Sequence, residues 1–296
     1  MNVHNSSMVM KPAGTYEPGQ ARWNDRRSQL RRRQLLGALV TLPFAGALPA
    51  YRQRDFAVGY GATPAMRLQT GLALLGGIGR FVPPGARVLI KPNAGYARDP
   101  LEGATTDPQM LSAVVRELRR AGAKTITVAD NPVDDAQAAF ARSGLQAACK
   151  DLGVRQWLPS ALVFDEARGL ENCSLFAAPL ESTDVVVNLA TAKAHPLIGV
   201  SGAMTNLLGF FGGERAALHG ELAAALPRLE RLVRPQLNIV DGGRVVFSIG
   251  PAAGTHAALA STPWLGVGTR AAEVDAWVWR ALLRRQDPFP FTVGHS

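Results

Sequence analysis

Four short apolar runs of the kind that form buried β-strands recur along this chain, and each is followed by polar side chains. The runs lie at residues 87–90, 125–129, 184–187 and 237–240. Between the first two, apolar residues at 111, 114, 115 and 118 have helical spacing, which indicates a helix over residues 108–121. A strand, a helix and a second strand in this order favour a parallel sheet with a right-handed crossover. The sequence therefore predicts an α/β fold, with a mainly parallel sheet flanked by helices.

The remaining pattern after residue 50 is that of a single α/β domain over residues 51–296. The hydrophobic content of 47% is enough for a large core. An irregular insert with short strands is expected around residues 151–180. Further helices are expected at residues 66–78, 136–145, 145–152, 221–233 and 271–285.

Polar residues at the ends of the predicted strands are candidates for a binding site. They are Lys91, Asn93, Asp130, Asn188 and Asp241, and Lys193 and His195 follow on a turn closed by Pro196. The carboxyl ends of parallel strands meet at one edge of a sheet, where ligands bind in open α/β folds. Asn and Asp are also ordinary residues of strand ends and helix caps, so each one alone has a purely structural interpretation. Their repetition over four strands favours a shared pocket.

The candidate residues contain more hydrogen-bond donors than carboxylates, which suits a small anionic ligand. The predicted ligand-binding residues are Lys91, Asn93, Asp130, Asn188, Asn206, Arg215, His219 and Asp241. Lys193 and His195 are the predicted catalytic residues, because a lysine and a histidine can move protons or stabilise charge near neutral pH. The alternatives are a backbone-bonded turn for His195 and a solvated helix face for Arg215 and His219.

A second interpretation is a non-catalytic accessory or binding protein for a metal centre or a redox partner. Its metal ligands would be His195, His219 and Asp241, since two His and one Asp from separate segments can form a metal site. No His-x-x-x-His or Glu-x-x-His spacing supports this interpretation.

Cysteine content limits the cofactors that the chain can hold through sulfur. The two cysteines are Cys149 and Cys173, too few for a zinc or iron–sulfur cluster site. They can pair in an oxidising compartment or stay as buried free thiols, and the sequence leaves both open. No cofactor is assigned.

An ordered series of motifs resembles the family of the domain of unknown function 362. The motifs are Ile90-Lys-Pro-Asn93, Thr106-Asp-Pro108, Gly122-Ala-Lys124 before Asp130, Val187-Asn188, Lys193-x-His195, Asn206-Leu-Leu-Gly209, Asp241-Gly242, Gly250-Pro-x-x-Gly254 and Val274-Asp275. The resemblance covers about residues 86–280 and implies no settled activity. The family usually has Lys where this chain has Thr205. Some members carry a ferredoxin-like cysteine cluster, which this sequence lacks.

The N-terminal 50 residues have the pattern of a leader with a twin-arginine signal peptide. Arg32 and Arg33 precede a moderately apolar segment at 35–43, and residues 45–47 are a small-residue cleavage site. The apolar run is shorter than the ~20 residues that span a bilayer, so no stable transmembrane anchor is expected. The predicted partner is the twin-arginine (Tat) translocase, and the predicted location is the periplasm or the exterior of the cell.

The charge distribution argues against a nucleic-acid-binding protein. The formal net charge is +9, but residues 1–50 contain seven Lys and Arg against Glu17 and Asp25, which leaves +4 for the rest. Much of the basicity therefore belongs to the leader. No aromatic and basic RNA motif or arginine-rich recognition helix is present, so no nucleic-acid partner is predicted.

Overall fold

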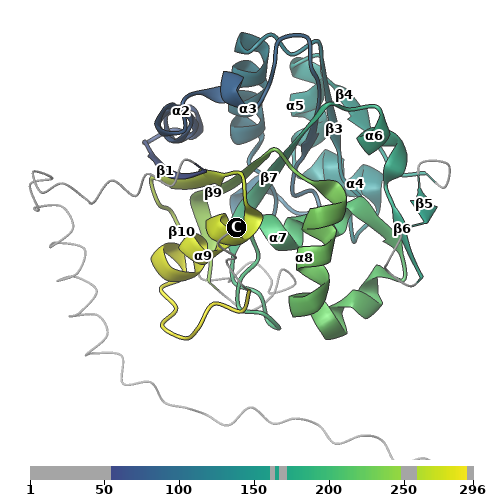
Figure 1. Cartoon of the computed structure of the whole chain (residues 1–296), viewed down its shortest axis with the longest axis vertical. Helices are drawn as coiled ribbons and strands as arrows, with labels where there is room; N and C mark the ends of the chain where they lie inside the picture. Colours follow the sequence, from purple (N-terminus) through teal and green to yellow (C-terminus); the bar gives the residue numbers. More distant parts are fainter. Residues whose placement is uncertain (1–54, 161–163, 167–171, 248–258, 292–296) are drawn as a thin grey trace, which may run out of the picture. The chain divides into compact units, whose positions relative to one another are not determined.

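A mainly parallel sheet of eight strands lies at the centre of the computed structural model, which describes residues 55–160, 164–166, 172–247 and 259–291 (Figure 1). Its strands run in the order β1 (Phe56–Tyr60), β11 (Trp264–Gly268), β9 (Leu237–Val246), β7 (Val185–Lys193), β2 (Arg87–Lys91), β3 (Thr125–Ala129) and β4 (Arg155–Trp157), with β10 (Leu259–Ala260) paired to β9. The neighbouring strands β9, β7, β2, β3 and β4 are parallel, and β11 is antiparallel to both of its neighbours, β9 and β1. The predicted α/β class is confirmed.

Helices cover both faces of this sheet (Figure 1). One face packs against α2 (Pro64–Leu74), α3 (Pro108–Arg120), α4 (Ala136–Arg142) and α5 (Leu145–Asp151). The other face packs against α7 (Ala203–Asn206), α8 (Leu222–Val233), α9 (Ala271–Trp277) and the π-helix η6 (Val278–Leu282). Every residue of β7 is buried, as expected for a central strand between two helix layers.

The sequence signals place α3 for clear physical reasons. Asp107 caps its N-terminus by accepting a hydrogen bond from the Gln109 amide, and Pro108 occupies the first turn, where no amide donor is needed. The apolar stripe of α3 is buried against the sheet. The predicted helices at 221–233 and 271–285 correspond to α8 and to α9 followed by η6.

The predicted insert around residues 151–180 contributes to two sheets. Its β4 joins the main sheet, while β5 (Asp165–Glu166) and β6 (Cys173–Leu175) form an antiparallel sheet with β8 (Phe211–Gly213). Helix α6 (Ala177–Glu181) follows. Cys149 in α5 and Cys173 in β6 are both buried free thiols, and burial raises the pKa of Cys149 to about 11.

Short 3-10 helices complete the described secondary structure. They are η1 (Ile78–Arg80), η2 (Pro100–Glu102), η4 (Leu207–Phe210) and η5 (Arg215–Glu221). The glycine-rich segment after residue 199 thus forms the short succession α7, η4 and β8 rather than one long helix.

Two strands are longer than the sequence pattern predicted. We expected strand ends at Asn188 and Asp241, but β7 continues to Lys193 and β9 continues to Val246. The two strands are neighbours, and their pairing continues past the end of β2 with an irregularity between Thr191 and Lys193. The prediction that Lys193 lies on a turn is therefore wrong: Lys193 is the last residue of a buried strand.

Two sequence features fall outside the described residues. These are the predicted leader and signal peptide at residues 1–50, and the Gly250–Gly254 motif. Within the described part of the chain, no helix combines the length and the apolar character needed to cross a membrane.

Candidate functional site

A cavity of about 120 Å³ opens at the edge of the sheet where β2 and β3 end. Seven of the predicted site residues line it: Lys91, Asn93, Asp130, Lys193, His195, Asn206 and Arg215. They come from five separate segments of the sequence. The parallel sheet therefore brings together most of the polar residues predicted to share one pocket.

A buried ion pair between Lys91 and Asp130 forms the base of the cavity. The Lys91 Nζ lies 2.8 Å from Asp130 Oδ1, and the two side chains are 1% and 2% exposed. Lys91 Nζ also donates to the carbonyl of Pro92 at 2.8 Å and to Asn206 Oδ1 at 3.0 Å. Burial lowers the pKa of Lys91 from its usual value, and the Asp130 carboxylate opposes this shift. With three acceptors around it, the Lys91 ammonium group is held in one position.

Gly209 is packed directly against this pair. A Cβ atom at position 209 would lie 1.9 Å from Asp130 Oδ1 and 2.7 Å from Lys91 Nζ. The backbone amide of Asn131 also donates to the carbonyl of Gly209 at 2.9 Å. The glycine of the Asn206-Leu-Leu-Gly209 motif therefore allows the η4 backbone to approach the ion pair.

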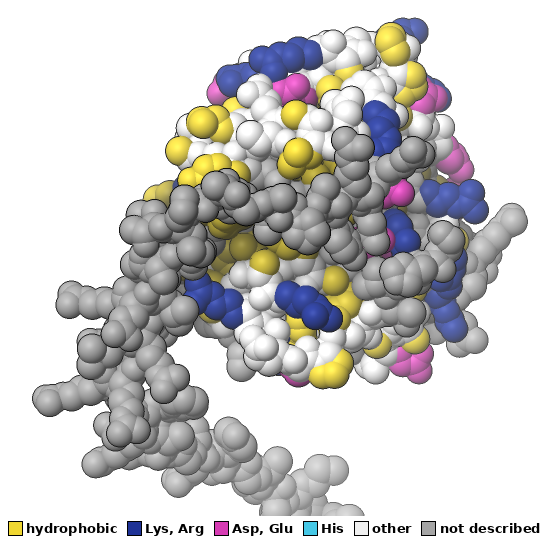
Figure 2. Space-filling view, turned by 60° about the vertical axis from the view of Figure 1, so that its left-hand side comes forward, with side chains coloured by type: hydrophobic (Ala, Val, Ile, Leu, Met, Phe, Trp, Pro, Cys, Tyr) yellow, Lys and Arg dark blue, Asp and Glu magenta, His cyan; other side chains and the backbone are white. Residues whose placement is uncertain are grey.

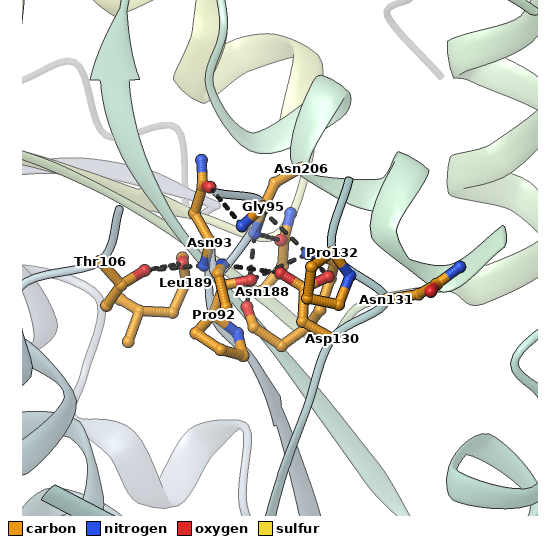
Figure 3. A network of polar contacts seen from close by, with 12 residues as sticks. Pro92, Asn93, Gly95, Thr106, Asp130, Asn131, Pro132, Asn188, Leu189 and Asn206 are labelled. Atoms are coloured by element: carbon orange, nitrogen blue, oxygen red, sulfur yellow. Dashed lines mark hydrogen bonds and ion pairs between the residues drawn. The ribbon is translucent and has the colours of Figure 1, made fainter. Parts of the chain in front are cut away.

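A chain of asparagine side chains continues from the ion pair into the core, and Figure 3 shows Asn206 and Asn188. Asn206 Nδ2 donates to Asn188 Oδ1 at 2.8 Å, and Asn188 Nδ2 donates to Asn238 Oδ1 at 2.8 Å. Asn188 Nδ2 also donates to the carbonyl of Ala203. Asn188 thus belongs to the network that supports the cavity, but it lies beneath the lining residues rather than among them.

Lys193 approaches the same cavity from the end of β7. Its side chain is buried, and its Nζ donates to the carbonyl of Ala104 at 2.8 Å. Burial lowers the pKa of Lys193 to about 7, repulsion from Lys91 acts in the same direction, and Asp130 opposes both. Because of this pKa, a substantial fraction of Lys193 side chains is neutral near pH 7.

Arg215 and His195 occupy the rim of the cavity, and both are half-buried. Arg215 donates to the carbonyls of Asn131, Pro132 and Phe211. Its contacts to the backbone make it more constrained than a solvated helix-face arginine. His195 Nδ1 accepts a hydrogen bond from the Leu197 amide at 3.2 Å, so the proton of a neutral His195 ring is on Nε2.

Thr106 connects the loop after β2 to β7. Its hydroxyl donates to the carbonyl of Leu189 at 2.9 Å and accepts from the Asn93 amide at 2.8 Å. The Asn93 side-chain oxygen accepts a long contact of 3.4 Å from the Gly95 amide (Figure 3). Thr106 therefore sets the position of the Asn93 backbone and leaves the amide side chain on the cavity wall.

Asp241, which the sequence placed among the candidate site residues, does not line this cavity. It forms an ion pair with Arg67, with Arg67 Nε 3.0 Å from Asp241 Oδ1, and both side chains are buried. Side chains alternate between the two faces along a strand, so Asp241 faces the side of the sheet that packs against α2, whereas Asn238 faces the asparagine chain.

One of the three metal ligands suggested by the sequence, Asp241, lies on the other face of the sheet from the cavity. His195 lines the cavity while Asp241 is paired with Arg67. The side chain of His219, in η5, lies outside the part of the structure that is described. The described residues contain no group of three or more His, Cys, Asp or Glu side chains that could hold a metal ion.

The sequence pattern did not single out some of the cavity-lining residues, and it marked one supporting residue without its role. Tyr96, Asn131 and Ser201 line the cavity from loops. Asp275 accepts hydrogen bonds from the amides of Ala203 and Met204 and so fixes the start of α7, and burial raises the pKa of Asp275 to about 7. The Val274-Asp275 motif marked this position without indicating its role.

Thr205 occupies the position at which the resembled family usually has Lys. Its hydroxyl lies 3.1 Å from the Ser201 hydroxyl and accepts from the Gly202 amide at 3.0 Å. Thr205 also lines the cavity. In this chain the position therefore supplies a hydroxyl group and no positive charge.

The positive charge of the cavity is a local feature of the sheet edge. Lys91, Lys193 and Arg215 line it together with one carboxylate, Asp130. On the face drawn in Figure 2, by contrast, the Lys and Arg side chains of the described residues form several separate groups with acidic and apolar side chains near them.

Comparisons with known proteins show a matching family and a relative. The family described as domain of unknown function (DUF362) matches residues 88–280, about two thirds of the chain. A protein named as thylakoid-associated, from Synechocystis sp., is 29% identical over 188 residues, which are 59% of this chain and 57% of the relative. The alignment thus covers little more than half of the length of that relative.

Proposed function

This chain belongs to the DUF362 family, and we propose that it is an exported protein whose sheet-edge cavity binds a small anionic molecule. The excess of cations in the cavity supports this proposal most directly. The cations of Lys91 and Arg215 line it, together with Lys193 when its amine is protonated, against the single carboxylate of Asp130. Buried charges of one sign cost free energy unless a partner compensates them, and a bound anion would supply the missing negative charge.

The dimensions of the cavity favour a ligand with few atoms. Its volume is about 120 Å³. A protein cavity of about 150 Å³ can hold a benzene molecule. Phosphate, sulfate and short carboxylates are therefore of suitable size, and a nucleotide could enter only in part.

The polar groups that face the cavity favour chemistry on the bound molecule rather than storage alone. Lys193 is buried with a pKa of about 7, and His195 presents an imidazole on the same cavity. A lysine with a pKa near neutrality can accept a proton and return it during one reaction cycle, and imidazole is a common general acid and base in enzymes. We therefore propose Lys193 and His195 as acid–base or electrostatic catalytic groups, with Lys91 and Arg215 holding negative charge.

Anion affinity is expected to depend on the Lys193 amine and to fall as it deprotonates. Lys193→Met should weaken the binding of sulfate and of acetate about tenfold or more at about pH 6, because a charge-assisted hydrogen bond contributes about 1.5–3 kcal/mol. In the unsubstituted protein, affinity should decrease as the pH rises through about 7, where Lys193 loses its positive charge. Calorimetric titration measures both effects, since neither anion changes charge between about pH 6 and pH 9.

The matched control for this titration is Lys124→Met, which removes an exposed lysine outside the cavity. This variant should bind both anions as the unsubstituted protein does. Equal affinities for Lys193→Met and Lys124→Met, or failure of both anions to bind the unsubstituted protein, would contradict the proposed anion site.

Export is expected to depend on the paired arginines of the leader. Replacement of Arg32 and Arg33 by Lys should leave most of the protein in the cytoplasm, because the Tat receptor reads the two guanidinium groups, whereas a merely basic leader tolerates Lys. Fractionation of cells measures the distribution. Arg26 and Arg27, an adjacent pair before the motif, provide a matched control by the same replacement. Normal export of the Arg32 and Arg33 variant would remove the twin-arginine interpretation.

A further inference from the structure

We propose that Lys193 is a nucleophilic amine that forms an imine with the carbonyl carbon of a small keto or aldehyde acid bound in the cavity. This inference rests on the anion-binding role proposed above and adds a substrate class and a covalent step to it. The carboxylate of such a molecule would satisfy the cations of the cavity, and its adjacent carbonyl group would be the site of attack.

The environment of Lys193 differs from that of the second buried lysine in the cavity. Lys91 is fixed by the Asp130 carboxylate and by two further acceptors. Within the described part of the chain, the Lys193 Nζ has only the neutral carbonyl of Ala104 as an acceptor. Lys193 thus lacks the carboxylate partner that keeps a lysine protonated, which leaves its amine able to act as a nucleophile.

The charged groups around the cavity make the neutral amine accessible near physiological pH. Burial lowers the pKa of Lys193 to about 7, and the Lys91 ammonium group adds to this effect while Asp130 opposes it. The other titratable groups on the cavity are His195, Arg215 and Tyr96. A lysine that is desolvated and next to another cation is a known arrangement for imine formation.

Hydrogen-bond donors are available for the carboxylate of the substrate. Asn93 lines the cavity, and its Nδ2 has no dashed contact to any residue drawn in Figure 3. The Tyr96 hydroxyl and the Arg215 guanidinium group lie on the same cavity. These groups and the Lys91 charge would orient a carboxylate, while Lys193 reaches the neighbouring carbonyl carbon.

The covalent step balances without an oxidant or a reductant. The neutral Lys193 Nζ attacks the carbonyl carbon, a C–N bond forms, and the carbonyl π pair moves to oxygen. The nitrogen then loses a proton and the oxygen gains one, which gives a carbinolamine. His195 lines the same cavity, and in its protonated imidazolium form it can donate a proton to the hydroxyl group as it leaves and so become a neutral imidazole. One water molecule is released, and the product is a protonated imine.

Reductive trapping tests this inference on the whole protein. Pyruvate is added together with cyanoborohydride, which reduces an imine to a stable secondary amine, and the modified residue is found by mass spectrometry of peptides. We expect modification of Lys193 to exceed that of the exposed residues Lys124 and Lys150 at least tenfold. Methyl pyruvate has the same ketone without the carboxylate charge, and it should label Lys193 at least tenfold less.

The variant Lys193→Arg separates this inference from the proposed function. It keeps a cation in the cavity but has no amine, so it should bind sulfate and give no trapped product. Pyruvate that binds by calorimetry but leaves no adduct on Lys193 would overturn the imine and leave the anion site intact. Three other results would also overturn the inference: labelling of all lysines to the same extent, preferential labelling of Lys91, or labelling of Lys193 by methyl pyruvate as strong as that by pyruvate.

Discussion

Replacement of Gly209 by alanine is expected to destabilise the protein by about 3–5 kcal/mol, in the range found when a buried ion pair is broken. A Cβ atom at this position would lie 1.9 Å from Asp130 Oδ1 and 2.7 Å from both Lys91 Cε and Lys91 Nζ. Both side chains are buried and held by further hydrogen bonds, so they cannot move aside without losing partners. The glycine backbone is not in the left-handed region, and the effect therefore comes from crowding alone.

Thermal unfolding measures this loss as a decrease in Tm of about 6–20 °C for a chain of this size. The matched control is Gly79→Ala, because a Cβ atom at the exposed Gly79 would meet no atom within 4 Å. Gly209→Ala should also lose affinity for sulfate, since the displaced Lys91 and Asp130 both line the cavity. Equal melting temperatures for the two variants would show that a Cβ atom at position 209 does not clash with the ion pair.

The residues predicted best from the sequence are those at the ends of short parallel strands. Lys91 ends β2, and Asp130 directly follows β3. The polar residue stands at the end of the apolar run in both cases, so the strand end could be read directly from the sequence. A parallel sheet then places these ends together without any information about side-chain contacts.

Strand length and side-chain alternation explain the errors. The run from Val185 to Lys193 contains an asparagine and a threonine, and we took the asparagine as the strand end. Polar residues inside a central strand are tolerated when they are hydrogen-bonded, as Asn188 is by Asn206 and Asn238. If the predicted strand had included the whole of β9, the alternation of side chains along a strand would have placed Asn238 and Asp241 on opposite faces of the sheet.

Contacts between distant segments had no local signal at all. Arg67 and Asp241 are 174 residues apart in the chain, and only the fold brings them together. The same holds for Asp275, which caps α7 from α9. The role of Gly209 also depends on a distant contact, because its backbone packs against the Lys91 and Asp130 side chains. A sequence motif can mark such a glycine, but the reason for it appears only when the ion pair is in place.

Replacement of Asp130 by asparagine is expected to destabilise the protein by about 3–5 kcal/mol, because it leaves the Lys91 charge buried without a counter-charge. Asparagine has nearly the same shape and can still accept the hydrogen bond of 2.7 Å that the Ala94 amide donates to Asp130 Oδ2. The loss is therefore electrostatic rather than a loss of packing. Denaturant unfolding at several pH values measures its size and its dependence on the charge of Lys91.

The pH dependence follows from the pKa of Lys91, which burial already lowers in the folded protein. Without Asp130, the folded-state pKa falls further below the unfolded value of about 10.4. Between these two values the unfolded chain binds more protons than the folded chain, so stability rises with pH. The deficit of Asp130→Asn should accordingly shrink as the pH is raised from about 7 to about 10.

A double variant distinguishes an unpaired charge from general damage to the site. Lys91→Met with Asp130→Asn removes both charges and fills nearly the same volume, and neutral replacement of a buried pair is often close to neutral in stability. It should be more stable than Asp130→Asn by more than about 1 kcal/mol, within the range of coupling between contacting residues. If the two substitutions instead lower the free energy of unfolding additively and without pH dependence, then packing, and not the charge of Lys91, makes Asp130 important.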